Sequence, residues 1–248
     1  MKILVCISSV PDTTTKIKFT ADGKSLDNNG VQFVINPNDE FGLTKALQLK
    51  EANGGSVTVL NVGGADTEPV IRKALAIGAD SAVRINATPT DSLFVAKQIS
   101  EYAKSESFDL ILCGKESIDY NGNQVPGMLA SLLSCSAVNP CTGLTIEGDK
   151  ATAERLIDGG KEILESSLPL VVGGQKGLVH EDELRIPNMR GIMQARTKPL
   201  NVVEPSNNDA SLSDASYELP ADKADCKLVD ADNVAELVSL LHNEAKVI

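Results

Sequence analysis

Short apolar runs alternate with helical patterns over the first two thirds of the chain, and this alternation constrains the fold more than any other feature. The runs at residues 2–7, 56–62, 82–85 and 108–113 are almost continuously apolar, which is typical of strands buried on both faces. Between them, apolar side chains recur at helical spacing. Helices of this length form right-handed crossovers, so the pattern predicts an α/β fold with a parallel sheet and helices on both faces.

The alternation of apolar runs with helical patterns ends at about residue 140. Residues 144–147, 151–157 and 163–167 are short, alternate in polarity and are separated by turn residues, which predicts antiparallel strands. Residues 168–173 return to a continuous apolar run, and residues 189–195 form a candidate short helix. We therefore expect a sheet that is parallel in its centre and mixed at its edge.

The last segment differs in composition from everything before it. Residues 204–232 hold eight acids against two lysines and few large apolar side chains, so they cannot bury much area by themselves. Residues 232–243 then read as a short amphipathic helix that needs a surface to dock on. We expect an α/β domain over residues 1–203 and a C-terminal arm over residues 204–248.

Charge and rare residue types exclude several classes of function. Acids outnumber bases 34 to 23, a formal net charge of −11, whereas a protein that binds nucleic acid needs a basic surface. Two histidines nearly exclude a His-rich metal site or a Ser-His-Asp triad. Five cysteines without a C-x-x-C pair, no signal peptide and no long apolar run lead us to expect a cytoplasmic protein without membrane insertion.

The loop after the fourth strand is the strongest candidate binding site. It runs from Gly114 to Met128 and enters a helix, and ligands of open α/β sheets bind outside the carboxyl ends of the strands. Gly114, Gly122 and Gly127 permit a close approach of the backbone, and free amides at the helix start suit a phosphate better than a metal. An ordinary polar loop remains the alternative interpretation.

A second candidate is the block Asn36-Pro37-Asn38-Asp39, whose helix-start amides could face an adenine or a ribose. Plain helix capping explains the same residues and is favoured on physical grounds alone. Cys6 ends the first strand, where an unpaired cysteine is more often a small core residue than a nucleophile. The charged stretches at residues 154–162 and 180–185 need no function beyond a hairpin tip and a solvated loop.

Taken together, these stretches resemble the β subunit of electron transfer flavoproteins over essentially the whole chain. Six blocks occur in the order that is typical of that family: KILVCISSVPD, INPNDEFGLTKAL, IRKALAIGAD, FDLILCGKESIDYNGNQVPGMLA, ERLIDGGKEILESSLPLVV and RIPNMRGIMQARTKPL. The resemblance implies an adenine-nucleotide α-hydrolase-like fold. It also implies a heterodimer with an α subunit that holds most of an FAD. That FAD takes electrons from acyl-CoA or other dehydrogenases and passes them to a quinone reductase or another acceptor.

The resemblance further implies a nucleotide in this subunit itself, AMP in most members and a second FAD in the bifurcating branch. The family's site positions fall on the strand ends and loops chosen above. They are Cys6, Asn36, Pro37, Asn38, Asp39, Val62, Gly114, Lys115, Glu116, Ser117, Ile118, Asp119, Tyr120, Asn121, Gly122, Asn123, Gln124 and Val125. Gln124-Val125 and Asn38-Asp39 lean toward the bifurcating pattern, so AMP and a second FAD both remain open. A stand-alone ATP-binding module is a third alternative.

Overall fold

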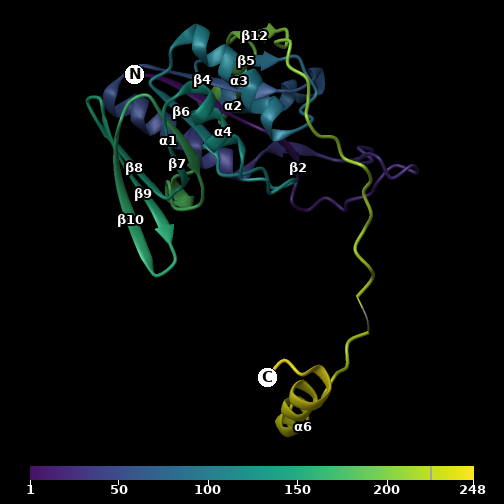
Figure 1. Ribbon diagram of the computed structural model, residues 1–248. Coiled ribbons are helices and arrows are strands. Elements are labelled where there is room, and N and C mark those ends of the chain that lie inside the picture. The colour runs from purple at the N-terminus through teal and green to yellow at the C-terminus, as the bar shows by residue number, and fades with distance from the viewer. Residues whose placement is uncertain (224) are drawn as a thin grey trace.

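The computed structural model describes residues 1–223 and 225–248, and a seven-stranded parallel sheet forms its centre (Figure 1). The spatial order is β12-β5-β4-β1-β6-β11-β7, and every neighbouring pair in it is parallel. The strands are β1 (Lys2–Cys6), β4 (Ser56–Val62), β5 (Ser81–Ile85), β6 (Leu110–Gly114), β7 (Ser136–Cys141), β11 (Leu170–Gly174) and β12 (Leu200–Val203).

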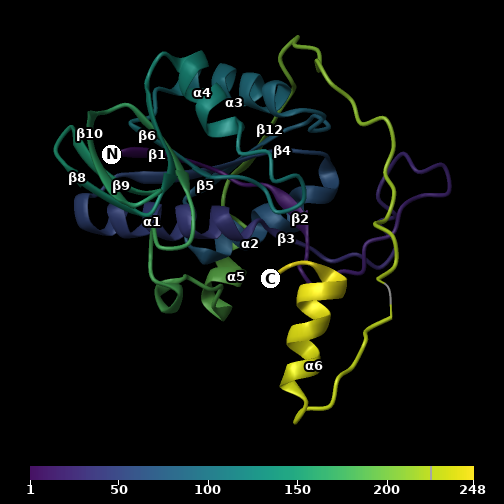
Figure 2. The ribbon, with the colours of Figure 1, turned by 60° about the horizontal axis from the view of Figure 1, so that its bottom comes forward.

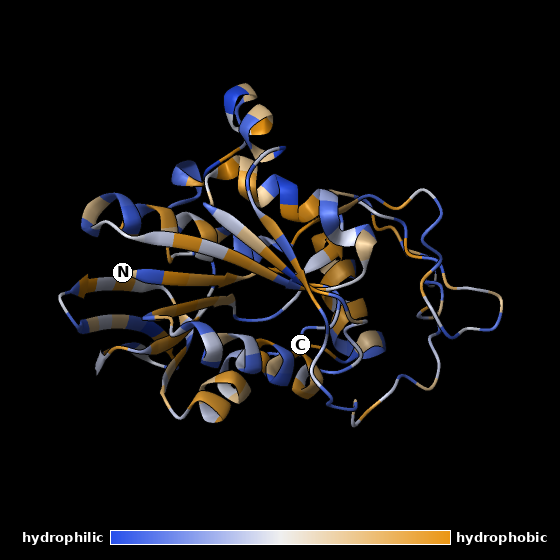
Figure 3. Cartoon of the chain, turned by 90° about the horizontal axis from the view of Figure 1, so that it is seen from above, coloured by the Kyte–Doolittle hydropathy of each residue, from blue (hydrophilic) through white to orange (hydrophobic). Residues whose placement is uncertain are grey.

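Helices cover both faces of this sheet, as the alternation of runs predicts. Figure 2 shows α3 (Ser92–Glu106) and α4 (Val125–Leu133) on one side, with α1 (Pro37–Asn53) and α2 (Glu68–Ile77) on the other. Side chains of each strand alternate between two buried clusters: Ile3 and Val5 pack toward α1 and α2, whereas Leu4 and Cys6 pack toward α3 and α4. Hydrophobic residues accordingly run along the central strands in Figure 3.

The strand order places a topological switch point between β1 and β6. From β1 the chain moves outward to β4 and β5, then returns to the other side of β1 for β6. The connections therefore diverge at the carboxyl ends of β1 and β6, where a crevice forms in open α/β sheets.

One detail of the expected sheet is wrong, because its edges are parallel rather than mixed. The antiparallel strands β8 (Gly143–Glu147), β9 (Lys150–Ile157) and β10 (Gly160–Ser167) form a separate three-stranded sheet that projects from the domain (Figure 1). The edges are supplied by β7 and β12, which the apolar pattern does not mark. A further small pair, β2 (Ser9–Pro11) and β3 (Phe33–Ile35), brackets the loop after β1.

The remaining elements are short. Helix α5 (Met189–Ala195) has the predicted bounds and contacts α2. After β12 the described residues form no helix or strand until α6 (Val234–Ser239), which continues as a π-helical turn over Leu240–Ala245. Figure 1 shows α6 well away from the α/β domain. Among the described helices none combines the length and apolar character needed to cross a membrane.

Candidate functional site

A cavity of about 520 Å³ opens at the carboxyl ends of β1, β4 and β6, at the topological switch point. Its wall includes most of the residues singled out in the sequence: Cys6, Asp39, Val62, Gly114, Lys115, Glu116, Ser117, Asp119, Tyr120, Gly122, Asn123, Gln124 and Val125. Asn36, Pro37, Asn38, Ile118 and Asn121 are not part of that wall. The structure thus brings together loops that lie up to 119 positions apart in the chain, from Cys6 to Val125.

The Asn36–Asn38 block holds the wall rather than forming it. Asn36 occupies the N-cap position of α1, yet its side chain makes no capping bond. Instead the Nδ2 atoms of Asn36 and Asn38 each donate to the carbonyl of Glu116 at 3.0 Å, and Asn36 Oδ1 accepts from the Ile118 amide at 3.2 Å. These bonds hold the loop after β6 against the start of α1. Plain helix capping therefore accounts for the position of Asn36 at the start of α1, but it does not account for the hydrogen bonds of its side chain.

Asp39 joins the ends of the two strands that flank the switch point. One carboxylate oxygen accepts from the Ser8 amide after β1 and the other from the Gly114 amide of β6, each at 2.7 Å. Burial raises the pKa of this carboxyl from 3.8 to about 7, although the hydrogen bonds from Ser8, Asn36 and Gly114 act to lower it. The side chain is 3% exposed and lines the cavity, so the shape of the site depends on it.

Gly114 is the one glycine of this loop where a close approach requires the absence of a side chain. A Cβ atom there would lie 2.8 Å from Asn38 Cβ and 2.9 Å from Asn36 Nδ2, and it would collide with Asp39 Oδ1. At Gly127 a Cβ would meet nothing, and at Gly122 only Ser92 Oγ at 3.6 Å. The packing of the described chain therefore requires a glycine at Gly114 but not at Gly122 or Gly127, where the close approach of a ligand stays a prediction.

The end of the loop lines the cavity and contains a row of backbone amides without acceptors among the described residues. Asn121 and Asn123 have left-handed backbone conformations (φ 49° and 51°), which asparagine tolerates better than most residues. Within the described chain, no acceptor receives the amides of Gly122, Asn123, Gln124 or Val125, where α4 begins. Amides at a helix start next to left-handed turns make a concave anion-binding surface.

Charged side chains of the wall are mostly acidic. Asp39, Asp91, Glu116, Asp119 and Asp214 are its acids, and Lys115 is its one base among the described residues. Lys115 Nζ lies 3.1 Å from Glu116 Oε1, so its charge is already paired. The binding of an anionic group in this cavity therefore depends on backbone amides more than on charged side chains.

Comparison with protein-family models matches residues 24–208 to the electron transfer flavoprotein domain. The chain belongs to the electron transfer flavoprotein family. It is 39% identical over 262 aligned residues to electron transfer flavoprotein subunit beta of Bacillus subtilis (strain 168), with both chains fully covered. The subunit beta of Syntrophomonas wolfei is 35% identical, covering 100% of this chain and 98% of its own. The human subunit beta is 33% identical, covering 86% and 85%. These relatives assign the chain to the beta subunits of the family.

Several wall residues of this electron transfer flavoprotein subunit escape sequence reasoning. The additional wall residues are Ile7, Ser8, Ser9, Leu60, Asn61, Thr67, Pro89, Thr90, Asp91, Ser92, Val95, Ile99, Cys113, Leu212, Ser213 and Asp214. Asn61 donates to the Ile7 carbonyl at 2.8 Å, but its buried Oδ1 has no partner in the described part of the chain. An unpaired acceptor at the wall of a cavity marks a place where a ligand donor can bind.

Cys6 has the structural role that its sequence context predicts. Its thiol is buried in the cluster between the sheet and α3/α4, beside Cys113 of β6. The hydrogen bond with Cys113 and burial raise the pKa of the Cys6 thiol well above its usual range. A thiol in this state is a poor nucleophile, so Cys6 forms part of the cavity wall and does not act as a reactive group.

The other charged stretches behave as surface features. In the β9–β10 hairpin, Lys161 pairs with Glu154 at 2.9 Å and Arg155 pairs with Glu162, which ties the two strands together. His180 lies in an exposed turn before three acids. No cluster of three metal-ligating side chains occurs among residues 1–223 and 225–248.

We expect the titration of Asp39 to appear in the stability of the chain. Its pKa is about 7 when folded, against 3.8 as the ordinary value, so the folded state holds the extra proton between these pH values. The stability that this proton contributes is present below about pH 4 and is lost as the pH rises to about 7. Urea unfolding of the wild type and of Asp39→Asn from pH 4 to 8 measures it. The stability difference between the two should fall by on the order of 1 kcal/mol per pH unit up to pH 7. A difference that stays constant with pH would contradict this assignment.

Proposed function

We propose that this chain is the nucleotide-holding β subunit of an αβ electron transfer flavoprotein, with AMP in the cavity at the switch point. In this role it is an electron carrier rather than a stand-alone enzyme. An FAD shared with the α subunit supplies the redox chemistry, taking electrons from acyl-CoA or other dehydrogenases and passing them to a quinone reductase or another acceptor. The chain's own residues bind and orient. The observation that carries the proposal is the clamped loop over the cavity, built on the β1 and β6 ends.

The chemistry of the cavity suits an adenosine monophosphate. The free amides of Gly122–Val125 can donate to phosphate oxygens, and the unpaired Oδ1 of Asn61 can accept from an amino group of a base. Cys6, Val62 and Leu60 supply an apolar surface for the flat face of a base. These three properties lie around one cavity of about 520 Å³, within the usual range for small-molecule sites.

The charge of the wall weighs against an ATP-binding module. A triphosphate needs several cations or a metal beside it, whereas this wall has five acids and one already paired lysine. Hydrolysis or tight binding of ATP by the chain without an α subunit would revive that alternative.

The bifurcating alternative, with a second FAD in this cavity, rests on the Gln124-Val125 pair at the start of α4 and on Asn38-Asp39. Flavin absorbance of the purified heterodimer distinguishes simple electron transfer, with AMP in the cavity, from bifurcation, with a second FAD there. We expect a substrate-reduced dehydrogenase to bleach the flavin and a quinone reductase to restore it. Bleaching by NADH, followed by division of electrons between two acceptors, would favour the bifurcating reading. A flavin that neither a dehydrogenase nor NADH reduces would overturn both.

The C-terminal arm is the part of the chain that we propose clasps the α subunit. Val234, Leu237 and Val238 of α6 are between 45% and 62% exposed, and a helix of this length is marginal in water by itself. Each such side chain contributes about 1.5–3 kcal/mol when it is buried in an interface. An apolar helix at the end of an extended segment therefore fits a docking element.

We expect truncation after Pro205 to weaken the heterodimer at least tenfold, because it removes this helix. Truncation after Leu219 is the matched variant, since it keeps the residues that touch the α/β domain and removes only the distal part. Dissociation constants from analytical ultracentrifugation should rise for both variants. Co-purification of either truncated chain with the α subunit at wild-type yield and affinity would refute the clasp.

A further inference from the structure

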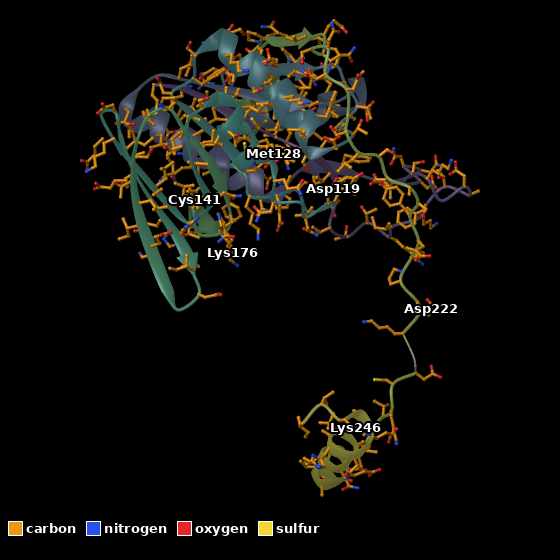
Figure 4. The ribbon with its side chains drawn as sticks, viewed as in Figure 1. Asp119, Met128, Cys141, Lys176, Asp222 and Lys246 are labelled. Carbon is orange, nitrogen blue, oxygen red and sulfur yellow. The ribbon has the colours of Figure 1, made fainter. Side chains whose placement is uncertain are left out.

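The first part of the C-terminal arm lies on the α/β domain of its own chain. We name residues 206–217 the proximal arm. At its beginning, the Ser206 amide donates to Gln98 Oε1 at 2.8 Å, and Gln98 Nε2 donates back to the Ser206 carbonyl at 3.1 Å. Gln98 is 2% exposed, so this reciprocal pair is shielded from water. Beyond the proximal arm, Asp222 and Lys246 lie away from the domain (Figure 4).

Asp91 holds the middle of the proximal arm. Its Oδ1 accepts from the Phe94 amide at 2.6 Å and caps α3, while its Oδ2 accepts from the amides of Ser211 and Leu212 at 2.5 and 2.9 Å. These hydrogen bonds lower the pKa of Asp91, so the carboxylate stays ionised and the bonds stay charge-assisted. One side chain thus fixes both the helix start and the path of the arm.

A cluster of two tyrosines and one acid closes the end of the proximal arm. The hydroxyls of Tyr120 and Tyr217 lie 3.1 Å apart, and both are within hydrogen-bond distance of Asp214 Oδ2. The Tyr217 ring stacks on Phe19 with centroids 5.2 Å apart, and its amide donates to the Gly23 carbonyl at 2.7 Å. The arm is therefore joined to the loop after β6 and to the loop after β2. Figures 1 and 2 show it running beside the loop after β2.

This segment is also a wall of the candidate nucleotide cavity. Leu212, Ser213 and Asp214 line the cavity, and Leu212 and Asp214 are hydrogen-bonded to Asp91 and Tyr120 of the same wall. Tyr217 lines no part of it and acts only through Asp214 and Tyr120. Because the wall comes from an extended segment held by hydrogen bonds and one aromatic stack, it can open without disturbing the sheet.

We propose that the proximal arm is a latch that retains the ligand of this cavity, with Tyr217 as a positioning residue. The proposal rests on the proposed function for the identity of the ligand. With the latch closed, the ligand leaves only after the bonds to Tyr120, Gly23 and Phe19 break. The latch carries the carboxylate of Asp214 at the cavity wall, which also contains Asp91 at the start of α3, and it adds no cation there. It therefore covers the hydroxyl-bearing part of a nucleotide rather than its phosphate.

Dissociation of radiolabelled AMP from the purified heterodimer, chased with unlabelled AMP, tests the latch. Tyr217→Ala removes the stack and the hydroxyl bonds, and we expect AMP to leave about tenfold faster with its association rate little changed. Tyr217→Phe keeps the stack on Phe19 and should give an intermediate rate. Leu219→Ala, an exposed residue just beyond the latch, is the matched control and should leave the rate at the wild-type value.

Hydrogen exchange supplies a second readout that a merely structural role of Tyr217 would not move. Amides of residues 206–217 should exchange more slowly in the wild type when AMP is bound, and this protection should vanish in Tyr217→Ala. An unchanged dissociation rate in Tyr217→Ala, together with normal AMP binding, would overturn the latch and leave the nucleotide site standing. A wild-type heterodimer that binds no AMP would instead overturn the proposed function.

Discussion

Gly114→Asp should strip the nucleotide from the heterodimer, with a loss of bound AMP of at least tenfold. A Cβ atom at this position collides with Asp39, and it crowds Asn38 Cβ at 2.8 Å. The new carboxylate would also be buried beside Asp39, which already has a pKa raised by burial. We expect the free energy of unfolding to fall by about 3 kcal/mol, measured by urea unfolding of the variant and the wild type.

Gly160→Asp is the matched control for this variant, because a Cβ atom there meets nothing within 4 Å and the same charge is added in open space. It should retain both AMP and stability. If the chain served only as a scaffold for the α subunit's flavin, Gly114→Asp would lose AMP and still transfer electrons at the wild-type rate. That outcome would show that electron transfer does not depend on the bound AMP, contrary to our proposal.

Asp39→Ala should be the most destabilising truncation of a single side chain in the site. It leaves the amides of Ser8 and Gly114 without acceptors at the ends of β1 and β6. Each buried unsatisfied amide costs about 1–3 kcal/mol, so we expect a loss of about 2–6 kcal/mol at pH 5, below the folded pKa of Asp39 of about 7, together with loss of AMP. Urea unfolding and nucleotide content measured on the same preparation give both values.

Glu40→Ala provides the comparison, since Glu40 is the adjacent acid in the first turn of α1. Its carboxylate pairs with Lys73 at 3.0 Å at a half-exposed position, where such pairs contribute at most about 1 kcal/mol. If both variants lost the same stability, the effect would come from the charge at the helix start. The bridge between the two strand ends would then have no special role.

The sequence predicts those parts of this molecule whose stability comes from local pattern and continuous burial. The strand at residues 56–62 and the helix that begins at Pro37 lie where expected, and the strand expected at residues 2–7 ends one residue earlier, at Cys6. All three are apolar runs or periodic segments. β7 and β12 escape prediction because they are edge strands with exposed polar positions, and β7 contains Pro140. Edge strands tolerate such residues, so their apolar signal is weak.

The sequence likewise predicts some parts of the candidate site and misses others. The loop 114–125 and Asp39 are found because glycines, amides and a strand end occur together in the sequence. The clamping role of Asn36 is not found, because its partner carbonyl at Glu116 lies 80 positions away. The same holds for Tyr217, whose contact with Tyr120 spans 97 positions and starts in a segment with almost no apolar signal. Contacts of this kind depend on tertiary placement, which no local pattern encodes.

The most direct test of the account is the nucleotide content of the purified heterodimer. The complex is denatured, and the released adenine nucleotides and flavins are separated by chromatography and quantified against protein. We predict one AMP and one FAD per heterodimer for the wild type. Two FAD without AMP would assign the cavity to the bifurcating alternative, and a heterodimer that releases no nucleotide beyond the shared FAD would contradict the central claim.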